Sequence, residues 1–305
     1  MTMHNSSPLL SRIAYDETVL PFRRLLVALS GRDTDCGLLR YAAMLNRVLT
    51  GAEIFCLHVA GNGDSPDLRR RFTSGVSELL PDVRSEVVAG DVLDSILAVA
   101  TAQNSDLILL GHSSGRRRRS LARRLSMKSP CSVWIAPAEA PPSITRVLVP
   151  FDFSRISADT MSVATALAEA AGIDECLALH VEFNQAIVTF DEIDEMVAQD
   201  RDRAFALFIA PINLHGVWVK PLFVDSPNVA QTIVRTAVEQ ACDLIVMGTR
   251  GRSPSAAVLL GSETEHCLMN APVPLLAVKH FGARLSLLKA LRDERLRKRG
   301  DERYT

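Results

Sequence analysis

The sequence has few features that would commit the chain to a special environment. Only 5% of its 305 residues are aromatic, and 34 Lys and Arg residues nearly balance 35 Asp and Glu residues. A net charge of −1 provides no overall field to attract nucleic acid or an anionic membrane. No apolar run is long enough to span a bilayer, and charges interrupt the apolar residues of the first 22 positions, unlike a signal peptide. We therefore expect a globular, cytoplasmic protein with no membrane contact.

Motifs for metals, disulfides and common nucleotide loops are also missing. The six cysteines are dispersed without a C-x-x-C pair, which favours reduced, buried thiols over a metal site or a disulfide framework. No G-x4-G-K-[ST] sequence occurs, so a P-loop is excluded. His58 and His180 each belong to an LHV segment inside an apolar run. We predict that both are hydrogen-bonded core histidines and not metal ligands.

What the chain does contain is an internal repeat. RRLLVALS from Arg23 matches TRVLVPFD from Thr145, and SPCSVWIA from Ser129 matches APVPLLAV from Ala271. Two copies of one unit therefore fill most of the chain, separated by the Pro-rich, turn-prone segment APAEAPPSIT. The predicted division is an N-terminal extension (1–22), a first domain (23–140), a second domain (141–281) and a charged amphipathic C-terminal tail (282–305).

Each copy alternates apolar strands with amphipathic helical patterns. This alternation predicts an α/β fold of two tandem doubly wound, Rossmann-like domains, each with a mainly parallel five-stranded sheet flanked by helices. In such sheets ligands bind outside the carboxyl ends of the strands. The last strands of the two copies, VWIAP and PLLAVK, are apolar enough to be covered. We expect them to pack together, so that the chain forms a pseudo-dimer.

One segment of the second copy predicts a phosphate site. GTRGRSPSAAVLLGSETE, from Gly248, follows the apolar run DLIVM and places Gly251 three residues on and Gly261-Ser262 after nine more. Glycines at a strand exit let backbone amides approach a ligand, and a Ser at a helix start adds a hydroxyl where anions are favoured. The alternative is that the glycines only turn the chain and Ser262 only caps a helix.

This spacing, with VPFDFS, LHV and APVPLLAVK around it, resembles the universal stress protein family, specifically its tandem two-domain members. The resemblance covers roughly residues 23–280. It implies regulation in stress and binding of ATP, of ADP or of another adenine nucleotide, with Mg²⁺ as a companion of the phosphates. Asp152 would face the adenine and Val181 would lie beside the base. The implied binding residues are Pro150, Phe151, Asp152, Val181, Met247, Gly248, Arg250, Gly251, Gly261, Ser262, Glu263 and Thr264.

The first copy departs from this pattern. Ser30 stands where the second copy has Asp152, and the segment between Gly111 and Pro130 is five residues shorter and lacks the Gly-Ser pair. We therefore expect a degenerate nucleotide site without its carboxylate, and one nucleotide per chain. The shortened segment carries a basic loop, residues 116–128, with Arg116 to Arg119. It is either a solvated surface or a patch that binds an anion or a protein partner.

Two rival functions stay open. ALSGRDTD faintly resembles the pyrophosphate loop of ATP pyrophosphatases, but Arg32 and Asp35 replace its second Gly and final Ser. Because no base and nucleophile are placed together, we expect at most a slow ATPase. In the other rival, the chain is an interaction module that recruits a protein partner, or a second copy, through the basic loop and the tail. No aromatic residues accompany the arginines, so nucleic acid is not expected.

Overall fold

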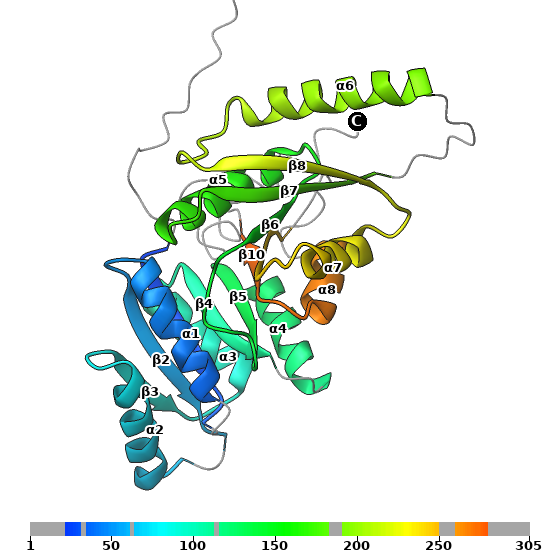
Figure 1. Cartoon of the computed structure of the whole chain (residues 1–305). Helices are drawn as coiled ribbons and strands as arrows, with labels where there is room; N and C mark the ends of the chain where they lie inside the picture. Colours follow the sequence, from blue (N-terminus) through cyan, green and yellow to red (C-terminus); the bar gives the residue numbers. More distant parts are fainter. Residues whose placement is uncertain are drawn as a thin grey trace, which may run out of the picture.

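The computed structural model describes residues 22–31, 35–61, 64–112, 116–182, 191–249 and 260–279 (Figure 1). Strands and helices alternate in both halves. The strands are β1 (Arg24–Leu29), β2 (Glu53–Val59), β3 (Arg84–Val88), β4 (Leu107–His112), β5 (Ser132–Pro137), β6 (Val147–Pro150), β7 (Glu175–Glu182), β8 (Trp218–Asp225), β9 (Leu244–Gly248) and β10 (Leu275–Val278). The helices are α1 (Asp35–Val48), α2 (Pro66–Leu79), α3 (Val92–Ala102), α4 (Arg116–Lys128), α5 (Arg155–Ala170), α6 (Asp191–Ile209), α7 (Val229–Glu239) and α8 (Ser262–Asn270).

The ten strands form one sheet in the order β3-β2-β1-β4-β5-β10-β9-β6-β7-β8. Within each half all pairings are parallel and the order is that of a doubly wound fold, which confirms the predicted fold class. The halves join where β5 and β10 pair antiparallel, with Trp134 opposite Leu276. The pairing expected of the two last strands is therefore present.

Helices cover both faces of the sheet, and the apolar core differs between the faces. On one face a single cluster runs through both halves, beneath α1, α2, α5 and α6, and includes the fully buried Trp134. On the other face the core divides into two clusters, one beneath α3 and α4 and one beneath α7 and α8. Because Trp134 lies at the junction of the halves, the first face packs the two repeats into a common core.

A repeated carboxylate fixes the amino ends of the central strands. Asp106 accepts hydrogen bonds from the backbone N–H groups of Arg23 and Arg24, at 2.8 and 3.0 Å. In the second half Asp243 accepts from the backbone N–H groups of Thr145 and Arg146. Each Asp precedes β4 or β9, so the Asp of both DLI segments ties a central strand to its neighbour.

The cysteines, together with His58 and His180, have mainly structural roles. All six cysteines are free, and all but Cys36 are buried. The rings of His58 and His180 bond through Nδ1 to the carbonyls of Leu29 and Phe151, at 3.1 and 2.9 Å, as predicted for core histidines. Within the described ranges, no helix has the length and apolar character needed to cross a membrane.

Candidate functional site

The candidate site lies at the carboxyl ends of β6 and β9, which are neighbours in the sheet. The chain leaves β6 toward α5 on one face and leaves β9 toward α8 on the other face. This divergence marks a topological switch point, the place where open α/β sheets typically form a ligand-binding crevice. Pro150 ends β6, Met247 and Gly248 end β9, and Val181 is the penultimate residue of the adjacent β7.

Asp152, directly beyond β6, is held by the start of α5. Its Oδ1 accepts from the backbone N–H of Ser154 at 3.1 Å and from Ser157 Oγ at 2.9 Å. Ser154 is the N-cap of α5, with its own side chain accepting from the Ser157 N–H. These two bonds fix the orientation of the Asp152 carboxylate at the start of α5.

Phe151 points away from the crevice, into the core. Its side chain is 5% exposed and its ring stacks on Phe208 with centroids 5.3 Å apart. The backbone N–H of Phe151 bonds to the Leu179 carbonyl and its own carbonyl bonds to His180. Phe151 is thus positioned to support the strand end beside Asp152 rather than to line the crevice with its ring.

The start of α8 is tied to the end of β9. Thr264 is buried, and its Oγ1 donates to the Gly248 carbonyl at 2.8 Å. The Gly261 N–H donates to the Thr249 carbonyl at 2.9 Å. Gly261 is the N-cap of α8 and makes no side-chain capping bond. The first N–H groups of α8 therefore lie next to Gly248. They form the positive end of the helix dipole.

The side chains of this helix start are mixed in sign. Ser262 and Glu263 are exposed, and Ser262 Oγ donates to Glu263 Oε1 at 3.3 Å. Burial, with a smaller effect of the Glu263 charge, raises the pKa of Cys267 to about 12. The Glu263 carboxylate, in the first turn of α8, adds a negative charge at the place where the sequence predicts a phosphate. Arg250 and Gly251, two of the predicted binding residues, lie outside the described residues.

The sequence of this half resembles a known family. Residues 143–279 match the model of the universal stress protein family. Through this half, the chain is similar to universal stress proteins. It is 30% identical over 86 residues to a universal stress protein of Thermus aquaticus and 46% identical over 50 residues to one of Methanocaldococcus jannaschii. These matches cover 28% and 16% of this chain, and 63% and 29% of the relatives' own lengths.

Solved structures resemble the whole two-part architecture of this chain. A Pseudomonas aeruginosa protein described as functionally unknown matches 85% of this chain and 92% of its own, with a TM-score of 0.63 and 18% identity. A universal stress protein of Archaeoglobus fulgidus matches 87% of this chain and 100% of its own, with a TM-score of 0.59 and 19% identity. At these identities the likeness establishes the fold alone.

In the first half, the strand-end residue Ser30 lies beside a carboxylate from the start of α1, which the comparison of Ser30 with Asp152 did not predict. Ser30 Oγ donates to Asp35 Oδ1 at 2.8 Å, and the Gly31 N–H donates to Asp35 Oδ2 at 2.6 Å. The repeat aligns Ser30 with Asp152 and Asp35 with Ser157. The two halves therefore contain the same Ser–Asp hydrogen bond with the residues exchanged, and the carboxylate moves from the strand end to the helix start.

This exchanged pair lies at a cavity of about 240 Å³. Its wall is mostly apolar, and burial raises the pKa of Tyr41, one of the lining residues. The other lining residues include Ser30, Asp35, Val92, Ile96, Gly111, Leu121 and Ala136. Sequence reasoning missed Asp35 as a crevice residue because a strand-end position was compared only with its aligned position. The five-residue spacing of Ser and Asp in both halves was the available signal.

The basic segment is a helix, so its description as a loop is wrong. Arg116 to Arg119 form the first turn of α4, and α4 packs against α8 of the other half (Figure 1). Arg123 Nε donates to Glu265 Oε1 at 2.5 Å, with both side chains partly exposed. Arg123, from the same basic helix, thus contributes to the contact between the halves, close to the candidate site.

Proposed function

We propose that this chain acts as a universal stress protein, binds one adenine nucleotide, ATP or ADP, at the crevice of its second half and regulates the stress response in a nucleotide-dependent way. The observation that carries the proposal is the spacing of Gly248, Gly251 and Gly261-Ser262. Gly248 ends β9 and Gly261 is the N-cap of α8, which places the spacing on a strand exit and a helix start. That arrangement supports a phosphate cradle built from backbone N–H groups.

The nucleotide would lie across the crevice. Asp152 would accept from the exocyclic amine of adenine, while Val181 and Met247 would border the base and ribose. The amides near Gly248, Gly251 and Gly261, with the Ser262 hydroxyl, would donate to the phosphates, and Arg250 adds a positive charge. Glu263 opposes a high negative charge, so we expect ATP to bind together with Mg²⁺, which offsets that repulsion.

We further propose that the chain acts as a pseudo-dimer in the cytoplasm. The antiparallel pairing of β5 with β10 supports the pseudo-dimer, and six free cysteines are consistent with a reducing compartment.

The test is the stoichiometry of nucleotide binding. The full chain is purified, denatured, and its released nucleotide is identified by chromatography, and the emptied protein is titrated calorimetrically with ATP and Mg²⁺. One site per chain is expected, weakened by Asp152→Ala and nearly unaffected by the matched control Ser30→Ala. Two equivalent sites, or equal losses from both substitutions, would contradict the assignment to the second half.

A further inference from the structure

The cavity of about 240 Å³ in the first half lies at that half's own switch point. It is found at the carboxyl ends of β1 and β4, which are neighbours in the sheet. The chain leaves β1 toward α1 on one face and leaves β4 toward α4 on the other face. Because open α/β sheets bind ligands at such a point, the cavity is where the first half would hold a ligand of its own.

The walls of this cavity are apolar at positions where the second half is polar. On the first helix of each repeat, Leu38 aligns with Thr160. On the last helix, Leu121 aligns with Glu263 in the alignment that places Trp134 with Leu276. Both changes remove a hydrogen-bonding or charged side chain from the first-half cavity. The described lining residues that keep a polar side chain are Ser30, Asp35 and Tyr41.

The segment that links the two halves forms part of the cavity wall. Gly37, on α1, stands where the second half has Asp159. A Cβ at Gly37 would meet the carbonyl oxygen of Ala138 at 2.7 Å, so a glycine is needed for this close approach. Ala138 and Ala140 line the cavity beside α1. The linker thus adds apolar surface to the cavity, and a ligand that enters removes this surface from water.

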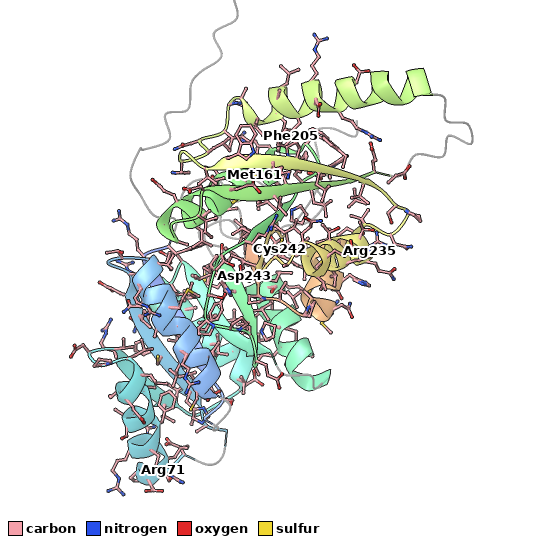
Figure 2. All side chains as sticks on the ribbon, viewed as in Figure 1. Arg71, Met161, Phe205, Arg235, Cys242 and Asp243 are labelled. Carbon is pink, nitrogen blue, oxygen red and sulfur yellow. The ribbon has the colours of Figure 1, made fainter. Side chains whose placement is uncertain are left out.

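Tyr41 is the buried polar residue of the cavity. It is 1% exposed, and its ring meets that of Trp134 edge to face, with centroids 5.9 Å apart. Within the described part of the chain, neither the Tyr41 hydroxyl nor the Trp134 indole N–H makes a hydrogen bond of ordinary geometry. Burial raises the pKa of Tyr41, Trp134 opposes this shift, and the charge of Asp243, labelled near the centre of Figure 2, adds to it. The hydroxyl is therefore neutral, and a ligand that bonds to it removes the cost of leaving it unpaired.

The charges around the cavity disfavour an ion as its ligand. Among the described lining residues the charged one is Asp35, whose carboxylate accepts from the Ser30 hydroxyl and the Gly31 N–H. Its negative charge repels anions, and the apolar walls make it costly to bury any charge that finds no partner. Arg32 and Arg116 to Arg119 follow β1 and β4 in the sequence, but their side chains lie outside the described residues. An anionic probe is therefore needed as a comparison.

The size of the cavity limits the ligand further. An apolar cavity of about 150 Å³ holds benzene, whereas pockets for drug-sized ligands begin near about 300 Å³. A volume of about 240 Å³ suits a molecule of one or two rings and is small for a nucleotide. We propose that this cavity binds an uncharged molecule of one or two rings that carries a single hydroxyl or N–H group. The rings contact the apolar walls, and the polar group bonds to Tyr41. The site does not depend on nucleotide binding by the second half.

Three probes of similar size test the proposal: phenol, toluene and benzoate. Each is titrated into the full, 15N-labelled chain, and NMR follows the backbone amides of Gly37 and Gly111, which line the cavity. Phenol should shift both signals with a Kd on the order of 1 mM, as expected for so small a ligand. Benzoate should bind at least about tenfold more weakly. The amide of Gly248, which aligns with Gly111, should not respond to phenol. Absence of a saturable shift with phenol, or tighter binding of benzoate or ATP at Gly37 and Gly111, would overturn the proposal.

Two pairs of variants locate the bound ring. Leu121→Glu introduces the aligned residue of the second half and should weaken phenol binding at least about tenfold. Its control, Arg124→Glu, changes an exposed position of the same helix and should not. Val92→Trp should fill the cavity, since Val92 lines it and is 40% exposed, whereas Val238→Trp on α7 should leave binding unchanged. Circular dichroism checks that each variant is folded. Unchanged binding in both Leu121→Glu and Val92→Trp would refute the assignment to this cavity.

Tyr41→Phe tests the polar contact with little change in the shape of the cavity. The affinity for phenol should fall about fivefold, because its hydroxyl loses a partner. The affinity for toluene should stay within about twofold, because toluene has no group that bonds to a hydroxyl. An unchanged affinity for phenol, or equal losses for phenol and toluene, would contradict the contact with Tyr41.

Discussion

Asp152 offers a test that separates a ligand contact from a structural one, because its carboxylate also supports the start of α5. In Asp152→Ala, the Ser154 N–H loses its acceptor and Ser157 Oγ keeps only the Ser154 carbonyl, which should cost about 1 kcal/mol of unfolding free energy. If the carboxylate also accepts from adenine, the donor left unpaired weakens binding by about 1–3 kcal/mol, or roughly 5- to 150-fold in Kd.

Asp152→Asn distinguishes the two roles. An asparagine keeps one oxygen for Ser154 and Ser157, so unfolding free energy should stay within about 0.5 kcal/mol of the parent. Its NH2 group, however, is a donor and cannot accept from the adenine amine. We therefore expect an affinity loss close to that of Asp152→Ala with little loss of stability. Urea denaturation and calorimetric titration with ATP and Mg²⁺ measure both quantities. Full affinity in the Asn variant would refute the adenine contact and leave only the structural role.

Three other predictions concern the thiols, the junction and the basic helix. Burial raises the pKa of Cys56 and Cys176 to about 12, so the folded state resists their ionisation. Stability should be full below about pH 8.5 and fall toward pH 12 by about 1.4 kcal/mol per thiol and pH unit, measured by urea denaturation with reductant. Replacing both by Ala should reduce that slope by about 2.8 kcal/mol per pH unit, leaving the part that the other buried thiols contribute, and an unchanged slope would show that other groups cause it. Residues 145–305 expressed alone expose the edge of β10, so they should melt below the full chain in calorimetry; an unchanged melting temperature would contradict this. Neutralising Arg116 to Arg119 should change nucleotide affinity less than about twofold, because salt screens charges that lie far from the phosphates. A tenfold loss of affinity in titration would place these arginines at the phosphates.

Much of the fold followed from the repeat and from periodicity. The alternation of strands and helices and the pairing of the last strands, VWIAP and PLLAVK, occur as predicted, because apolar patterns and packing favour the same elements. The helix α4 was missed, since four successive arginines give no apolar periodicity at its start. Packing against α8 through the rest of the helix stabilises it nonetheless.

The candidate site was less accessible to such reasoning. Gly248 and Gly261 are recognisable because a backbone cradle needs glycine at defined spacing. The structural roles of Asp152 and Thr264 could not be predicted from the sequence. They depend on which hydrogen bonds form between the ends of β6 and β9 and the starts of α5 and α8. The exchange of Ser30 and Asp35 could not be detected by comparing aligned positions singly, since two compensating changes look like two losses.

The contact between Arg123 and Glu265 has a consequence for how the two repeats evolved. In the alignment that places Trp134 with Leu276, Arg123 aligns with Glu265, so each of these residues contacts its own counterpart. Two identical chains related by a twofold axis would bring arginine against arginine, or glutamate against glutamate, at this point. Joining the copies in one chain lifts that restriction. Opposite charges can then meet across the axis, and the two halves recognise each other in preference to a copy of themselves.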